Sequence, residues 1–575
     1  MKKNTILYIS VTIFFLVLTT IFVYRYVKNE SPVYIYDYSG YHEMYKRFSN
    51  EFMTSKRAYI KEVISSIRNS DYNCSPIVLL LPFYMIFKAS RFGYILGCSL
   101  LYVIPTMILT IVLTKKMIFK EYSGNKEDNK FRIMFTIFLC IVSFLYTRWW
   151  SPTLRGLPDI IAVIPLTCAG LIVLKHSFIE KQKIYIPMTI GFLMYLCFLF
   201  RRYFIYCVIG FYLSLFIKEF IRFLKISDKE ERKEKFINAF KNFLIAGLTT
   251  IFCVLILQLP LVKNILQQNY KESYSAYQDT FLNHIVNTVD EFGIVILIFV
   301  AIGIIYTLCC KKHRKNGIFC LTNIFICYGT FATVQGMGVH HYLAISVWMF
   351  ILFIYGVYGI CEILKNKLLQ NFFLIGIILI MSINFSTTYI FRDTTIPIIS
   401  QRNKYCKFYY ENFEELERLI GDIDKIVSEK NTKFSVFASS YILSDNILEL
   451  LGTDNMKKSI VYPSIIDLRD GMSFDSLLSE YIIVTNIPQT GTSVEGQRVI
   501  SVPNNEIVNR TSIGKAYEKI SDEYVLCDGI KAYIFKKTRG FTEEEVNEFM
   551  YILESYYPEW KEKYTVSDYS ILIEK

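Results

Sequence analysis

The sequence lacks the motifs by which many enzymes hold a nucleotide or activate a nucleophile. It contains no P-loop, no G-x-S-x-G or H-E-x-x-H motif, no CxxC and no glycine-rich loop of the dinucleotide-binding type. Internal repeats and low-complexity tracts are also absent. These absences argue against a nucleotide-sugar substrate and against a metalloprotease or serine-hydrolase mechanism.

What the sequence does have is a series of apolar runs. Of its 575 residues, 53% are hydrophobic, and the chain is too long for one ordinary soluble domain. Runs of about 20 apolar residues can cross a hydrocarbon core of about 30 Å. We therefore predict a polytopic α-helical membrane protein with about eleven transmembrane helices, near 5–24, 93–114, 131–147, 158–175, 184–200, 203–220, 242–260, 292–310, 318–336, 342–361 and 371–390.

The distribution of basic residues predicts the orientation. Loops on one side of these spans carry 25 Lys and Arg, whereas the short loops on the other side carry six. Basic loops remain cytoplasmic, so we expect a cell-membrane protein with a cytoplasmic N-terminus and an extracytoplasmic C-terminal domain. The net charge of +12 is spread over these loops and not gathered on one face, so no nucleic-acid partner is expected.

The composition predicts two domains. Residues 1–394 form the transmembrane domain, whose external loop 28–92 contains amphipathic patterns at 41–50 and 57–68, typical of interfacial helices. The segment Pro76–Phe87 is apolar but too short to cross the membrane. Residues 395–575 read as an extracytoplasmic α/β domain with helices at 409–430 and 542–556, and strands at 433–438, 481–485, 524–527 and 532–537.

The predicted spans themselves contain almost no charged residues. Ion-coupled transporters usually need ionisable groups in mid-membrane, so this scarcity argues against a pump. The polar residues instead lie at the predicted external ends of spans: Asp37, His42, Glu43, Arg148, Arg155, Asp159, Arg201, Arg202, Asp290, Glu291, His340 and His341. Separate loops therefore bring polar side chains to one face.

Two of these loops pair arginine with features that suggest an anionic substrate. In Arg155-Gly-Leu-Pro-Asp159, Gly and Pro indicate a tight turn that holds two charges, either as a binding site or as a structural Arg–Asp turn. Arg201-Arg202 places two guanidiniums where positive charge is disfavoured. Guanidinium groups match phosphate oxygens, so a lipid phosphate is the expected partner, with contact to lipid headgroups as the alternative.

The loop Gln335-Gly-Met-Gly-Val-His340-His341-Tyr342 provides two imidazoles beside flexible glycines. These could hydrogen-bond a phosphate or a sugar, or cap helix ends. A divalent metal is the minority interpretation, because adjacent His side chains are expected to point apart. No cofactor is required by the sequence.

The order of these features resembles the GT-C superfamily of integral membrane glycosyltransferases. One span is followed by a long external loop with an early acidic residue in Tyr36-Asp37-Tyr38, then by many spans and an external domain. The closest relatives in style are enzymes that use polyprenyl-phosphate sugars, such as protein mannosyltransferases and lipid A aminoarabinose transferases. The resemblance implies that Asp37 is the catalytic carboxylate and that the turn from Arg155 to Asp159 lines the site. The second acidic residue of a paired motif is not adjacent; Glu43 is the nearest alternative.

The resulting hypothesis is an inverting glycosyl transfer at the external membrane face. Asp37 is the general base, and Arg155, Asp159, Arg201, Arg202, His340, His341, His42 and Glu43 bind substrate. The expected partners are a polyprenyl-phosphate sugar, membrane lipid, and a glycan, lipid or protein acceptor. From the Ile-, Lys-, Asn- and Tyr-rich composition we infer a bacterial cell-envelope polymer as the setting. The alternatives are a lipid-linked saccharide flippase and a non-catalytic membrane scaffold.

Overall fold

The structure is a computed structural model that describes residues 2–28, 30, 33–119 and 126–573. It divides into two compact units. The first, the membrane unit, consists of Met1–Glu30, Asp37–Gln268 and Asp279–Lys407. The second, the α/β unit, consists of Ser31–Tyr36, Asn269–Gln278 and Phe408–Lys575. Two short segments from the first half of the chain thus belong to the α/β unit.

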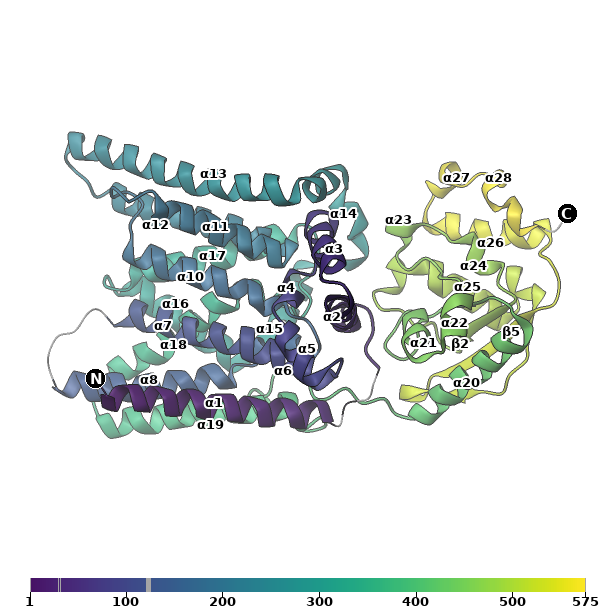
Figure 1. Cartoon of the computed structure of the whole chain (residues 1–575), viewed down its shortest axis with the longest axis horizontal. Coiled ribbons are helices and arrows are strands. Elements are labelled where there is room, and N and C mark those ends of the chain that lie inside the picture. The colour runs from purple at the N-terminus through teal and green to yellow at the C-terminus, as the bar shows by residue number, and fades with distance from the viewer. Residues whose placement is uncertain (1, 29, 31–32, 120–125, 574–575) are drawn as a thin grey trace. The chain divides into compact units, whose positions relative to one another are not determined.

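The membrane unit is built from helices and short helical turns (Figure 1). In chain order they are α1 (Lys2–Lys28), α2 (Asp37–Thr54), α3 (Lys56–Asn69), α4 (Ser75–Val78), α5 (Leu81–Phe87), α6 (Arg91–Cys98), η1 (Ser99–Val103), α7 (Ile104–Ile118), α8 (Lys126–Leu145), α9 (Thr147–Leu154), η2 (Asp159–Ala162), α10 (Val163–Lys175), α11 (Tyr185–Phe200), η3 (Arg202–Phe204), α12 (Ile205–Phe223), α13 (Lys229–Gln267), α15 (Phe281–Phe292), α16 (Ile294–Cys309), α17 (Arg314–Ala332), α18 (Leu343–Ile363) and α19 (Lys367–Tyr389).

Each of the eleven predicted spans coincides with helical structure, and the predicted class of polytopic helical membrane protein is confirmed. By length and composition, six helices within the described residues can cross a bilayer, or seven if α15 and α16 form one bent span. The eleven predicted spans also include apolar runs that form shorter helices. α10 and α11 contain 13 and 16 residues, fewer than the ~20 that span a bilayer without distortion.

The centre of the membrane unit is α18, which is buried along nearly its whole length. α16 lies directly against it, and a side chain at Gly303 would collide with the backbone carbonyl of Leu352. Small residues at such contacts let helix backbones approach closely inside a membrane. α13, in contrast, follows the outer edge of the unit in Figure 1, and most of its apolar segment is exposed. Such an all-round apolar, uncovered helix is typical of contact with lipid.

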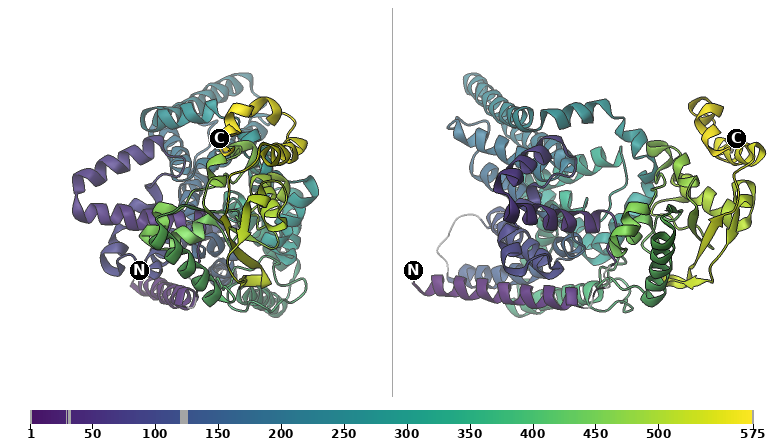
Figure 2. Two further views of the ribbon diagram at one scale, coloured as in Figure 1. Left: turned by 90° about the vertical axis from the view of Figure 1, so that its right-hand side faces the viewer. Right: turned by 45° about the vertical axis from the view of Figure 1, so that its right-hand side comes forward.

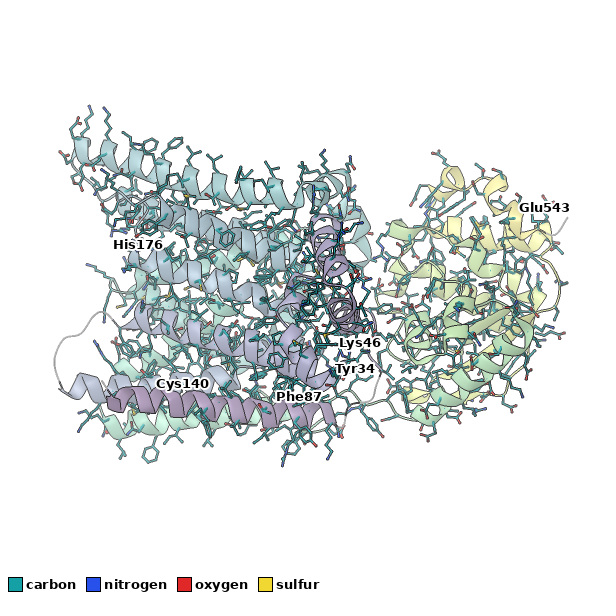
Figure 3. The ribbon with its side chains drawn as sticks, viewed as in Figure 1. Tyr34, Lys46, Phe87, Cys140, His176 and Glu543 are labelled. Carbon is teal, nitrogen blue, oxygen red and sulfur yellow. The ribbon has the colours of Figure 1, made fainter. Side chains whose placement is uncertain are left out.

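The external loop forms short helices as expected. The two amphipathic patterns are α2 and α3, and the Pro76–Phe87 segment folds into α4 and α5, which are too short to cross a membrane. Met85 and Ile86 of α5 are exposed apolar side chains. Figure 3 shows Lys46 and Phe87 at one end of the membrane unit and His176, just after α10, at the other. The loop helices therefore gather at one end of the helical stack.

The α/β unit contains a small mixed sheet between helices. Its elements are α14 (Tyr270–Ser273), η4 (Ser275–Tyr277), α20 (Phe413–Lys430), β1 (Phe434–Val436), α21 (Asp445–Leu451), α22 (Asp454–Ser459), α23 (Asp467–Asp470), α24 (Phe474–Leu477), β2 (Tyr481–Thr485), η5 (Val494–Gly496), α25 (Arg498–Asn509), η6 (Ser512–Ala516), β3 (Tyr517–Lys519), β4 (Tyr524–Val525), η7 (Cys527–Gly529), β5 (Lys531–Lys537), α26 (Glu543–Tyr556), α27 (Trp560–Lys563), α28 (Val566–Tyr569) and η8 (Ser570–Leu572).

The strand order is β1-β2-β5-β3, with β4 also paired to β5; β1 and β2 are parallel and the other pairs antiparallel (Figure 2). Successive side chains of β2 point to opposite faces. Ile483 packs in the cluster that contains Leu416 of α20, whereas Ile482 packs in the one that contains Phe549 of α26. All five β2 residues are buried, as expected for a strand covered on both faces. The predicted α/β class of this region is confirmed.

Candidate active site

Asp37 is the first residue of α2, where the positive end of the helix favours a carboxylate. Asp37 is partly buried, and this burial raises the pKa of the carboxyl group above its ordinary value. The Arg201 guanidinium opposes that increase in pKa, while the Asp159 carboxylate adds to it. Asp37 therefore lies within electrostatic range of both residues, although they come from loops more than a hundred positions away.

A tight turn brings the start of α2 to this place. Gly156 has a φ of +103°, and a Cβ there would lie 2.5 Å from the carbonyl oxygen of Tyr38 and 2.8 Å from Nη1 of Arg91. Arg91 donates from Nη1 to the Tyr38 carbonyl (3.2 Å) and from Nη2 to the Arg155 carbonyl (3.0 Å). Tyr94 donates to the Gly156 carbonyl (2.7 Å). Arg91 thus ties the 155–159 turn to the residue that follows Asp37.

Replacing Gly156 by Ala tests this arrangement. The positive φ alone should cost about 1–2 kcal/mol of unfolding free energy, and the new methyl group would push against the Tyr38 carbonyl. We expect a lower thermal midpoint in detergent and a loss of whatever activity Asp37 supports. Gly40→Ala is the matched control, because Gly40 lies on α2, the helix that begins at Asp37, and a Cβ there meets nothing within 4 Å. Equal midpoints for the two variants would contradict the close approach.

Asp159 and Arg201 form a fully buried ion pair. Nε of Arg201 lies 2.7 Å from Oδ1 of Asp159, and both side chains are at most 5% exposed. Nη1 of Arg201 also donates to the hydroxyl of Tyr41. The guanidinium carbon lies 5.1 Å from the ring centres of Tyr41 and Tyr72 and 5.5 Å from that of Tyr203. Three aromatic rings and one carboxylate therefore hold Arg201 in a single position.

The two histidines lie beside this pair. The ring centres of His340 and His341 are 3.9 Å apart, so the expectation that adjacent imidazoles point apart is wrong here. The turn at Gly338 explains this, because its N–H donates to Nδ1 of His341 (3.0 Å) and folds that ring back. Tyr203 donates to the His340 carbonyl (2.9 Å). Burial lowers the pKa of both imidazoles, and the positive charge of Arg201 lowers each further. Both rings are therefore neutral at pH 7.

Arg202 points to a different partner. Its Nη1 forms an ion pair with Asp71, and the two side chains are 19% and 38% exposed. Such a partly exposed pair contributes little to stability and can be exchanged for another anion at small cost. The two neighbouring arginines thus differ: Arg201 is locked in the interior, and Arg202 is accessible from solvent.

A second buried group involves Arg148 and Glu291. Arg148 forms a fully buried ion pair with Glu291. Glu291 also accepts hydrogen bonds from Nδ2 of Asn403 (2.6 Å) and from the hydroxyl of Tyr405 (2.5 Å). The Arg155 guanidinium carbon lies 5.8 Å from the Tyr405 ring centre, so Arg155 belongs to this second group and not to the Asp159–Arg201 pair. Every charge of the Arg148–Glu291 pair is compensated, as buried charges require.

Two residues singled out in the sequence are not part of either group. His42 is buried, its Nε2 lies 3.1 Å from the Ala89 carbonyl, and its ring stacks on Tyr94 at 5.2 Å. Burial lowers the pKa of His42 to about 3, and Arg91 contributes to that decrease. Glu43 is exposed and pairs with Lys46 at 2.7 Å on the helix surface. The structure does not bring Glu43 to the Arg201–Asp159 pair.

The site includes residues that the sequence did not single out. Tyr41, Tyr72, Asn403 and Tyr405 contact its charged groups, and Arg91 donates to backbone carbonyls beside them. Of these, Tyr41 could have been found from the sequence, because it lies four residues after Asp37 and therefore on the same face of the helix. Within the described parts of the chain, no group of three or more His, Cys, Asp or Glu side chains could hold a metal ion.

Neither a protein-family model nor a curated protein matches the sequence, but solved structures are similar to this chain. The chain is similar to ArnT from Cupriavidus metallidurans bound to undecaprenyl phosphate, with a TM-score of 0.45 and 8% identity over 91% of this chain and 98% of that one. For ArnT in the apo state, the TM-score is 0.45 and the identity 9%, over 93% and 98% of the two chains. Both similarities extend over nearly the whole of each chain.

Proposed function

We propose that the protein is a membrane glycosyltransferase that moves a sugar from a polyprenyl-phosphate donor to an acceptor hydroxyl at the external membrane face, with Asp37 as general base. One observation carries the proposal. A partly buried carboxylate at the start of α2 lies within electrostatic range of a buried Arg201–Asp159 pair, at the end of the helical stack where the loop helices gather.

The chemistry follows from the state of Asp37. Burial raises the pKa of its carboxyl group, so its carboxylate form is a stronger base than that of an exposed aspartate. Asp37 would accept the proton of the acceptor hydroxyl as that oxygen attacks the anomeric carbon. The bond from the anomeric carbon to the phosphate oxygen breaks in the same step, and polyprenyl phosphate leaves. One displacement inverts the configuration at that carbon.

The donor phosphate is negatively charged before and during the transfer, so it needs a cation. Arg202 is the best candidate, since its pair with Asp71 is partly exposed and a bidentate phosphate contact could replace it. Arg201 is held by Asp159 and Tyr41, so its role would be to set the local field and fix Asp159. The neutral imidazoles of His340 and His341 can donate hydrogen bonds to phosphate or sugar oxygens without adding charge.

The test is transfer by the purified protein in proteoliposomes. An undecaprenyl-phosphate sugar serves as donor and a bacterial envelope extract as the source of acceptor, and release of undecaprenyl phosphate is measured by mass spectrometry. Release that depends on the protein and on the acceptor supports the proposal. Movement of the intact lipid-linked sugar across the bilayer, without cleavage, would instead indicate a flippase.

Arg202→Gln gives a sharper test of donor binding. We expect KM for the lipid donor to rise roughly ten- to a hundredfold with little change in kcat, because a charge-assisted contact present before and during reaction is lost. Arg47→Gln is the control, since Arg47 is an exposed arginine of α2 that pairs with another carboxylate, Glu62, at 3.2 Å. An unchanged KM in Arg202→Gln would remove Arg202 from the phosphate site.

A further inference from the structure

The segment immediately before Asp37 belongs to the α/β unit and not to the membrane unit. Val33 is 2% exposed and packs in the cluster formed by α20 and the first two strands. Ile35 contacts the same cluster, and the ring of Tyr34 lies 6.3 Å from that of Phe408. Residues 33–36 are therefore held by side chains that follow them in sequence by about 370 positions or more.

Tyr36 makes the most specific contacts of this segment. Its backbone N–H donates to Oδ1 of Asn446 in α21 (2.8 Å), and its hydroxyl lies 2.7 Å from Oγ of Ser439. Tyr36 has a φ of +48°, a left-handed conformation that is rare for a large side chain. Such a conformation persists only where the surroundings over-determine it. Here Asn446 holds the backbone N–H of Tyr36, and Ser439 holds its side-chain hydroxyl.

These contacts lie where an open α/β sheet usually binds a ligand. Ser439 follows β1, and its N–H donates to the carbonyl of Gln489, which follows the parallel neighbour β2 (2.7 Å). Ligands of such sheets bind beyond the carboxyl ends of parallel strands. In this protein the Tyr36 side chain lies beyond the carboxyl ends of β1 and β2, so residues 33–36 occupy the place that a ligand takes in such sheets.

We propose that the α/β unit is a positioning element for the proposed base: it binds residues 33–36 at the carboxyl ends of β1 and β2, and thereby fixes where Asp37 and the first turn of α2 begin. Tyr36 and Asn446 are the positioning residues. This inference rests on the proposed function for its catalytic consequence. Because Asp37 is the next residue after Tyr36, any freedom gained by Tyr36 passes directly to the carboxylate.

The experiment compares Tyr36→Phe and Asn446→Ala with matched controls in the full-length protein in detergent. Tyr524→Phe removes a hydroxyl that donates to Asp422 at 2.7 Å in the same unit, and Asn455→Ala removes an amide that donates to Ser428 at 3.4 Å. Hydrogen–deuterium exchange is measured at amides 41–45, whose N–H groups bond to the first turn of α2. Loss of one hydrogen bond should speed exchange there about fivefold in the test variants and leave the controls unchanged.

Transfer kinetics provide the second measurement. We expect kcat to fall roughly ten- to a hundredfold in the test variants, with KM for the donor unchanged, because the base is misplaced while donor binding is intact. Unchanged exchange at 41–45 would overturn the inference, as would faster exchange with full kcat. If the wild-type protein releases no undecaprenyl phosphate, the proposed function fails. The exchange data then still decide whether the α/β unit holds the start of α2.

Discussion

Asp37→Asn is expected to lower sugar transfer by roughly 10²–10⁴-fold, the usual contribution of a general base. The amide keeps the size and much of the hydrogen bonding of the carboxylate but cannot accept the proton. Because Asp37 is not part of the buried Arg201–Asp159 pair, we expect the variant to insert in the membrane and to bind donor normally. Release of polyprenyl phosphate under single-turnover conditions measures the chemical step directly.

The pH dependence should identify the same group. A base works only when deprotonated, so kcat/KM falls as pH drops through its pKa in the free enzyme. Burial and Asp159 raise the pKa of Asp37. This fall in kcat/KM, the acid limb of the pH profile, should therefore occur at a higher pH than for an exposed aspartate. Arg201 opposes the shift, so Arg201→Gln should move the limb to still higher pH. Residual activity of Asp37→Asn should lack the limb altogether.

Glu43 is the competing base, and the same assay separates the two. Glu43 is exposed and paired with Lys46, so we expect Glu43→Gln to keep wild-type kcat. Loss of transfer in Glu43→Gln, with full activity in Asp37→Asn, would assign the base to Glu43 and contradict the proposed mechanism.

The second large effect concerns stability. Asp159→Leu would leave the Arg201 guanidinium buried without its partner, which should cost about 3–5 kcal/mol of unfolding free energy. The double variant Asp159→Leu/Arg201→Met removes both charges and should recover most of that loss, since apolar pairs often replace buried ion pairs at little cost. Neither variant should transfer sugar. Denaturant unfolding in detergent micelles gives the four free energies of the cycle.

An exposed pair provides the comparison. Lys515 and Glu548 lie 3.4 Å apart with nearly half of each side chain exposed, so Glu548→Gln should change the free energy by less than about 1 kcal/mol. If Asp159→Leu costs no more than this surface change, or if Arg201→Met does not rescue it, the two side chains are not coupled as the structure shows.

Much of the fold follows from local sequence signals. Apolar runs locate every predicted helix of the membrane unit, and the segment 481–485 forms β2 within the predicted bounds. The helix predicted at 542–556 forms as α26, and Thr542 with Glu545 makes a capping box at its start. Each predicted span coincides with helical structure, although a hydropathy pattern does not show where a short turn such as η2 precedes a helix.

The pairing of charges could not be predicted in the same way. Sequence analysis placed Arg155 and Asp159 in one turn, but Asp159 pairs with Arg201 and Arg155 lies near Tyr405. Which arginine meets which carboxylate depends on how separate helices pack, and one residue of offset changes the partner. Tyr405 and Asn403 lie in a stretch without regular secondary structure. Such a stretch has no hydrophobic periodicity, so the sequence could not indicate that these residues bind Glu291.

The α/β unit contains segments from distant parts of the chain, and this has a consequence for its synthesis. Residues 33–36 leave the ribosome early, but the strands and helices that bind them begin only at Phe408. At ~5–20 residues per second, this segment waits roughly 20–75 s for its partners to be made. Tyr36 therefore lacks its contacts with Asn446 and Ser439 until the last third of the chain is being translated. If those contacts position Asp37 as proposed, the site is completed only near the end of synthesis.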